Sequence, residues 1–114
     1  MSLGASASEN FATGTFTNES RTTNFSVEIP FEPSHFAIMA DNEGFPTDNV
    51  WKTIALTIPV FGGVGFASAR YSTSNINGAI RAANYFSYDS STHTLSGTVQ
   101  YNFVEDVTYY WVAW

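Results

Sequence analysis

The sequence predicts a single all-β domain, an antiparallel β-sandwich of six to eight strands. Three observations support this fold class. Apolar residues alternate with polar ones at a period of two, and no segment has a convincing helical period. Clusters of Gly, Pro, Asn, Asp and Ser recur at the roughly 8–12-residue spacing that is typical of sandwiches and jelly rolls. The 114 residues suit one domain with a modest core.

The N-terminal third contains the clearest strand. We expect residues 1–9 to be a flexible N-terminus that includes a cloning leader, and residues 10–114 to form the sandwich domain. Residues 11–17 predict a short strand that ends at a turn formed by Asn18-Glu19-Ser20. The strongest alternation follows, with Phe25, Val27, Ile29 and Phe31 on one face. Residues 35–40 predict the next strand.

Further strands continue to the C-terminus. Residues 41–49 are a loop by composition, and residues 51–60 alternate again before the Phe61-Gly62-Gly63 corner. Residues 64–71 predict another strand, and Asn77-Gly78 is a hairpin signal. Residues 79–88 are compatible with a strand or a short helix, and the surrounding strands favour the strand. The last two predicted strands cover residues 95–103 and 107–114.

Composition excludes several classes of function. The formal net charge is −6, and the four basic residues are spread along the chain, so nucleic-acid binding is not expected. No uninterrupted apolar stretch approaches about 20 residues, so membrane insertion is not expected. No cysteine is present, which excludes disulfides and thiolate chemistry. The N-terminus does not resemble a secretion signal. If the protein acts outside a cell, we expect it to reach that place by a route other than a cleaved signal, for example as part of a particle.

Residues that could support catalysis are few. His35 and His93 have no characteristic spacing to a nucleophile or a carboxylate, and we expect both to be structural. The acidic loop from Asp41 to Asp48 is either a solvated turn or a calcium site, although it lacks the EF-hand pattern. The sequence thus predicts no catalytic residues, no cofactor and no metal ligands, and indicates that the chain is not an enzyme. Two Asn-x-Ser sequons begin at Asn18 and Asn24.

Three residues are candidate ligand contacts. Trp51, Arg81 and Tyr85 fall on faces opposite the expected core. Aromatic rings can stack on the C–H face of a sugar, and a guanidinium can donate to its hydroxyls. The alternative is that these side chains contact a neighbouring subunit, because exposed aromatic residues mark interfaces in general.

The last predicted strand is apolar or aromatic on both faces. A strand with one face in solvent would not have this composition. We therefore expect an interior strand that buries one face in the core and has the other covered by a partner chain. The candidate interface residues are Tyr110, Val112 and Trp114.

Several segments together resemble a known family. These are Gly14-Thr15-Phe16, the run FSVEIPFEP from Phe25 to Pro33, the strand from Phe36 to Met39, and the closing run from Tyr110 to Ala113. They resemble the H-type lectin fold and the similar small sandwich modules of phage and prophage tail and baseplate proteins. The resemblance covers the two ends of the chain. It implies a six-stranded sandwich that assembles as a homotrimer. It also implies that the chain is found in a virion or outside the cell after particle release, and otherwise in the cytoplasm of the producing cell.

Three functions follow as hypotheses. The first is a phage- or prophage-derived tail, fibre or baseplate module, with host-surface carbohydrate as a candidate ligand. The second is a purely structural homo-oligomeric assembly domain without a small ligand. The third is a small carbohydrate-active enzyme, which the shortage of catalytic groups disfavours.

Overall fold

The computed structural model describes residues 7–8, 10–40, 48–60, 64–71, 74–81 and 86–114. Within these residues the chain forms strands and no helix, so the predicted all-β class is confirmed. The strands are β1 (Ala7–Ser8), β2 (Phe11–Phe16), β3 (Thr22–Glu28), β4 (His35–Ala40), β5 (Lys52–Pro59), β6 (Val64–Tyr71), β7 (Ser74–Arg81), β8 (Phe86–Asp89), β9 (Thr94–Phe103) and β10 (Tyr109–Ala113).

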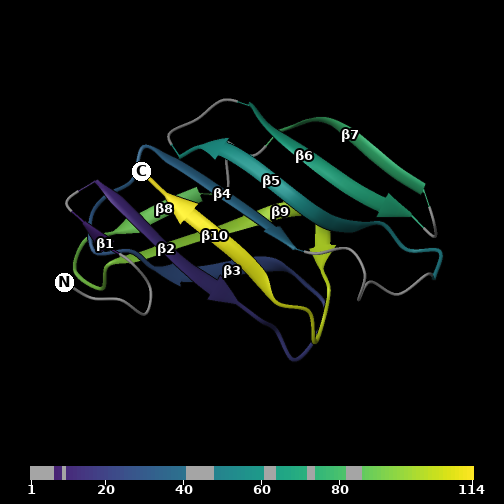
Figure 1. Cartoon of the computed structure of the whole chain (residues 1–114), viewed down its shortest axis with the longest axis horizontal. Coiled ribbons are helices and arrows are strands. Elements are labelled where there is room, and N and C mark those ends of the chain that lie inside the picture. Colours follow the sequence, from purple (N-terminus) through teal and green to yellow (C-terminus); the bar gives the residue numbers. More distant parts are fainter. Residues whose placement is uncertain (1–6, 9, 41–47, 61–63, 72–73, 82–85) are drawn as a thin grey trace.

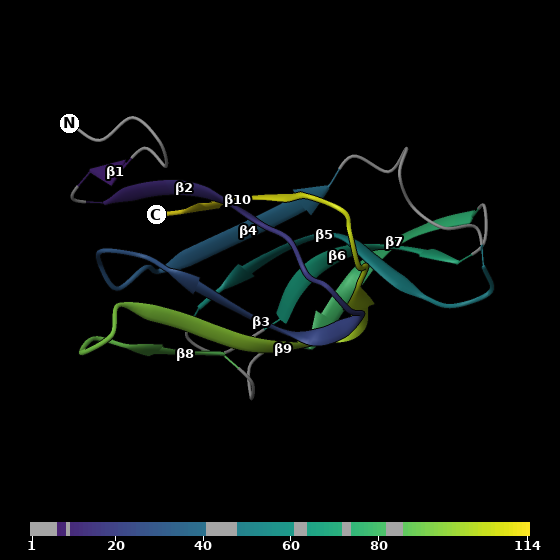
Figure 2. The same ribbon diagram turned by 90° about the horizontal axis from the view of Figure 1, so that it is seen from below.

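The strands form two layers that meet along one side (Figures 1 and 2). The large sheet has the order β1-β2-β10-β4-β5-β6-β7, with antiparallel neighbours throughout. The small sheet consists of β9 with β3 on one side and β8 on the other, also antiparallel. Within the described residues, the parallel pair of Lys52 with Asn102 joins the two sheets. The large sheet curls at β6 and β7, so the arrangement is that of a sandwich closed at one side (Figure 2).

The core lies between the layers and follows the predicted alternation. In β3 and just beyond it, Phe25, Val27 and Ile29 are buried while the residues between them are exposed. Strands β4, β5 and β10 bury every second residue against them, and β9 closes the core from the small sheet. Their buried residues are Phe36, Ile38, Ala40, Ile54, Leu56, Ile58, Leu95, Val99, Phe103, Tyr109, Trp111 and Ala113.

Aromatic rings join the two sheets at the centre of this core. Phe25 of the small sheet stacks on Phe36 of the large sheet, with ring centroids 5.2 Å apart and planes 4° from parallel. Phe103 packs its edge against Phe25 and Tyr109 at 5.9 and 5.1 Å. Edge-to-face and offset contacts of this kind add to the free energy of burial. They fix the separation of the two sheets.

Three details differ from the sequence expectations. Asn77-Gly78 lies inside β7 and not at a turn, because the hairpin between β6 and β7 reverses earlier, between Tyr71 and Ser74. The segment expected as one strand over residues 79–88 belongs to two strands, β7 and β8, in different sheets. Within the expected flexible N-terminus, Ala7–Ser8 pair with Phe11 and Ala12, and residues 1–6 and 9 lie outside the described residues.

Candidate functional site

β10 is an interior strand, as its two-faced apolar sequence predicts. It pairs with β2 on one side and with β4 on the other. Tyr109, Trp111 and Ala113 point into the core, and Tyr110 and Val112 point to the opposite side of the sheet. The strand therefore contributes to the core and to an outer surface at the same time.

That outer surface continues across the neighbouring strands. Residues directly opposite one another in antiparallel strands share a face. The register places Met39 beside Tyr110 and Ala55, and Thr57 beside Phe66. We call the resulting surface the outer face. Its members are Thr13, Thr15, Ala37, Met39, Ala55, Thr57, Phe66, Ser68, Tyr110 and Val112.

The outer face is apolar and exposed. Phe66, Met39 and Tyr110 have 70%, 60% and 58% of their surface in solvent. None of the ten positions carries a charged side chain, although the chain as a whole has a net charge of −6. The one charged residue of β6 is Arg70, two residues after Ser68. Large apolar side chains that gather on one face without charges are typical of protein interfaces.

The outer face has a hollow because large and small side chains alternate on it. Ala37 and Ala55 lie between the larger Met39, Tyr110 and Val112, and together with Ile38 and Thr57 they line a hollow of about 80 Å³. A hollow of this size accepts one side chain rather than a small-molecule ligand, for which sites usually measure roughly 300–1,000 Å³.

Trp114 extends the outer face at one end. Its backbone carbonyl accepts hydrogen bonds from the N–H groups of Ser34 and His35, each at 2.9 Å, and from the Ser34 hydroxyl at 3.0 Å. Its indole ring stacks on the His35 imidazole at 5.2 Å. The three predicted interface residues, Tyr110, Val112 and Trp114, thus fall on one side of the sheet. His35 has a structural contact with Trp114.

The predicted ligand residues do not form one described site. Trp51 precedes β5 and packs against Tyr71 and Tyr101, with ring centroids at 5.1 and 5.5 Å. Arg81 pairs with Val64 at the opposite end of β6 from Tyr71, so its backbone lies far from Trp51. Tyr85 lies outside the described residues. The structure instead groups Trp51 with two tyrosines whose spacing in sequence gave no signal, and we call these three residues the aromatic cluster.

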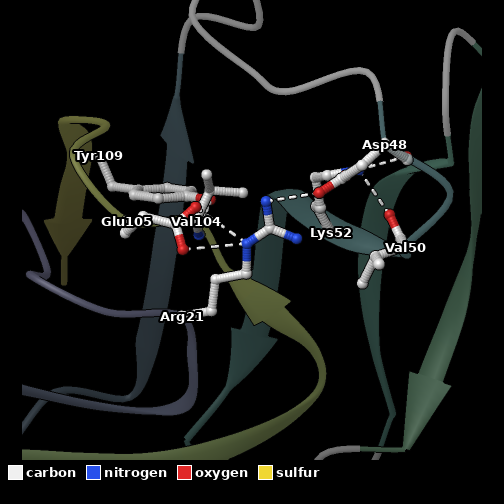
Figure 3. Close-up of polar contacts among 7 residues, drawn as sticks. All are labelled: Arg21, Asp48, Val50, Lys52, Val104, Glu105 and Tyr109. Atoms are coloured by element: carbon white, nitrogen blue, oxygen red, sulfur yellow. Dashed lines mark hydrogen bonds and ion pairs between the residues drawn. The ribbon is translucent and has the colours of Figure 1, made fainter.

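Lys52, which follows Trp51 in the chain, belongs to a network of charged residues (Figure 3). Arg21 forms ion pairs with Asp48 at 2.7 Å and with Glu105 at 2.9 Å, and Lys52 pairs with Asp48 at 2.6 Å. The hydrogen bonds from Lys52 and Arg21 lower the pKa of Asp48 below its usual value. Asp48, expected in a solvated or calcium-binding loop, is therefore engaged by cations of the chain. Residues 41–47 of that loop lie outside the described residues.

His93 occupies a turn beside a shallow cavity. Its backbone has a positive φ of 55°, and its carbonyl accepts a hydrogen bond from Ile29 at 2.8 Å. The imidazole contacts the Tyr88 hydroxyl at 3.2 Å, and that hydroxyl donates to the Ile29 carbonyl at 2.7 Å. These contacts give His93 a structural role. Among the described residues, no group of three or more His, Cys, Asp or Glu side chains could hold a metal ion.

The two sequons differ in their surroundings. The side-chain nitrogen of Asn18 is buried and has no hydrogen-bond partner in the structure. Glycosylation would require this nitrogen to be accessible. Asn24 is exposed, and its side-chain oxygen accepts a hydrogen bond from Thr98 at 2.7 Å.

Comparison with known proteins found no matching family model, no similar curated protein and no similar solved structure. The structure also contains, in the part of the chain that it describes, no helix long and apolar enough to cross a membrane. Conclusions about function therefore depend on the residues and surfaces described above.

Proposed function

We propose that this chain is a homo-oligomeric assembly module of a phage or prophage tail, fibre or baseplate, with three copies joined through the outer face. The exposed, uncharged outer face is the observation that carries the proposal. The particle setting is supported by the resemblance of the two ends of the sequence to tail and baseplate modules. In this role the protein binds and assembles and does not catalyse.

The area of the outer face is sufficient to contribute to an interface. Large apolar side chains have surfaces of roughly 150–250 Å² each. With 58–70% of each exposed, Met39, Phe66 and Tyr110 together leave about 280–470 Å² in solvent. Contiguous apolar patches on monomers reach roughly 300–600 Å², and a stable interface buries about 800 Å² per partner. The three side chains supply close to half of that requirement.

The distribution of charge favours a second copy of the same chain as the partner. Two copies with a net charge of −6 each repel one another at long range. Contact through the outer face brings no carboxylate of one copy against a carboxylate of the other, because none of the ten positions carries a carboxylate. Burying the face also avoids the cost of desolvating an unpaired charge.

Matched charge variants test the proposal. Tyr110→Glu and Met39→Glu each place a carboxylate in the middle of the face and should convert the oligomer to monomer. Gln100→Glu adds the same charge at an exposed position of β9 and should leave the oligomer intact. Light scattering after size exclusion gives the masses. An unchanged oligomer in both outer-face variants would contradict this assignment of the interface.

The aromatic cluster favours a second candidate function, a contact with host-surface carbohydrate. Tyr71 is exposed and packs against Trp51, which itself contacts Tyr101. Grouped rings of this kind provide the flat π surfaces on which sugar C–H faces stack. A glycan array with the wild type and with Tyr71→Ala tests it. Signals absent from the wild type, or equal in the two proteins, would contradict a carbohydrate site at the cluster.

A further inference from the structure

Lys52 is a charged residue without solvent exposure. Its side chain has 0% of its surface in solvent, although it lies in a strand next to the aromatic cluster. The ammonium donates to the carbonyls of Asp48 and Val50 at 3.0 and 2.6 Å and forms an ion pair with the Asp48 carboxylate at 2.6 Å. An ammonium has three N–H donors, so these acceptors satisfy it fully. All three belong to the short segment that precedes β5.

Arg21 connects this segment to the other side of the molecule. Its guanidinium contacts Asp48 from one side and both carboxylate oxygens of Glu105 from the other, the latter at 2.9 and 3.0 Å (Figure 3). Arg21 precedes β3 of the small sheet, and Glu105 lies between β9 and β10. The four residues Arg21, Asp48, Lys52 and Glu105, which we call the ionic clasp, therefore join connections of both sheets.

Asp48 is the residue of the ionic clasp on which acid can act. It is the one carboxylate in contact with Lys52 among the described residues, and 43% of its side chain is exposed. Protons from solvent can reach it directly. Protonation would leave the buried ammonium with carbonyl acceptors alone and would remove one of the two carboxylates from Arg21. A buried charge that loses its counter-charge is strongly unfavourable.

We propose that acid opens the ionic clasp. Protonation of Asp48 frees residues 48–51, and with them Trp51, while the core between the sheets stays folded. The proposal does not depend on the assembly function. The core itself consists of apolar and aromatic side chains that do not titrate in acid. Only residues 48–51, which the ionic clasp attaches to the rest of the fold, are released.

The direction of the effect follows from linkage. The pKa of Asp48 is lowered in the folded protein, first by the hydrogen bond from Lys52 and then by that from Arg21. The stabilisation is therefore complete above the usual carboxyl pKa of about 4 and is lost as the pH falls below it. Among the described residues, Arg21 pairs with this carboxylate, Glu105 pairs with Arg21, and Arg70 lies opposite Lys52 in the register of β5 and β6.

Two optical signals separate local release from unfolding. Near-ultraviolet circular dichroism, taken as the difference between wild type and Trp51→Phe, reports the packing of Trp51 against Tyr71 and Tyr101. Far-ultraviolet circular dichroism reports the strands. On titration from pH 7 to pH 2, we expect the Trp51 signal to be lost below about pH 4 while the strand signal persists. Loss of both signals in one step would overturn the proposal.

Variants identify the carboxylate responsible. Asp48→Asn should lack the Trp51 signal at pH 7 and show no further acid step, with its strands intact. Asp89→Asn is the matched control, because Asp89 also has a lowered pKa but is bound only within its own turn, chiefly by Ser91. It should behave as wild type. If Asp48→Asn is unfolded at pH 7, or keeps the acid step of the wild type, the proposal is wrong.

A double variant tests the role of the buried charge. Combining Lys52→Met with Asp48→Asn replaces the ion pair with groups that need no counter-charge, a change that proteins often tolerate. We expect the Trp51 signal to return at pH 7 and to remain through the acid range. Failure of the double variant to recover the signal that Asp48→Asn loses would show that the ammonium is not the group that drives release.

Discussion

Tyr109 combines full burial of an aromatic ring with hydrogen bonds from its hydroxyl to the backbone. Its side chain is fully buried, its hydroxyl donates to the Thr53 carbonyl at 2.7 Å and it accepts from the Val104 N–H at 3.1 Å. Tyr109→Phe would leave both backbone groups buried without this partner. We expect it to lower the free energy of unfolding by about 1–3 kcal/mol at pH 7, as measured by urea denaturation.

The same residue predicts a dependence on alkaline pH. Burial raises the pKa of Tyr109 to about 12, from an ordinary value of about 10. The neutral phenol is favoured in the folded state, so its stabilisation is complete below pH 10 and is lost as the pH rises toward 12. The stability difference between wild type and Tyr109→Phe should shrink across this range. A difference that stays constant from pH 8 to pH 12 would contradict this role for the phenol.

Gly97 lies at a closely packed position of the small sheet. It pairs with Phe25 of β3 and with Phe86 of β8, and a Cβ at this position would lie 2.8 Å and 2.5 Å from atoms of their rings. Gly97→Ala should therefore cost about 1–3 kcal/mol through overpacking. Gln100→Ala, at an exposed position of the same strand, should change stability by no more than about 0.5 kcal/mol. Equal values for the two variants in thermal denaturation would contradict the packing described.

At the scale of the strands, alternation in the sequence predicted which residues face the core. It identified Phe25, Val27 and Ile29, and the two-faced composition of the last strand indicated an interior position. It did not reveal the pairing partners. Asn77-Gly78 has strong local turn chemistry, yet β7 pairs with β6 along its whole length, and this tertiary pairing overrides the local preference.

The position of each strand in its sheet predicts an order of hydrogen exchange. β10 is paired on both sides, whereas β7 is paired in the described structure only with β6. Amides of an interior strand exchange only when larger parts of the fold open. We expect residues 109–113 to exchange more slowly than residues 74–81 in a mass-spectrometric experiment. Equal or reversed protection would contradict the strand order.

At the scale of the whole molecule, the candidate site was predictable only in part. Tyr110 and Val112 were recognised because their strand is apolar on both faces. Met39 and Phe66 were not, since each looks like an ordinary strand residue until the register of β4, β5 and β6 places them beside the others. The ionic clasp was missed because Arg21 and Glu105 are 84 positions apart and meet only through the fold.

The central proposal is that the exposed, uncharged outer face of one copy binds other copies of the same chain. The mass in solution tests this view most directly. Sedimentation equilibrium of the wild type at tens of micromolar should give three times the chain mass of 12.5 kDa. A species of 12.5 kDa at every concentration would contradict the proposal that the outer face joins copies of this chain.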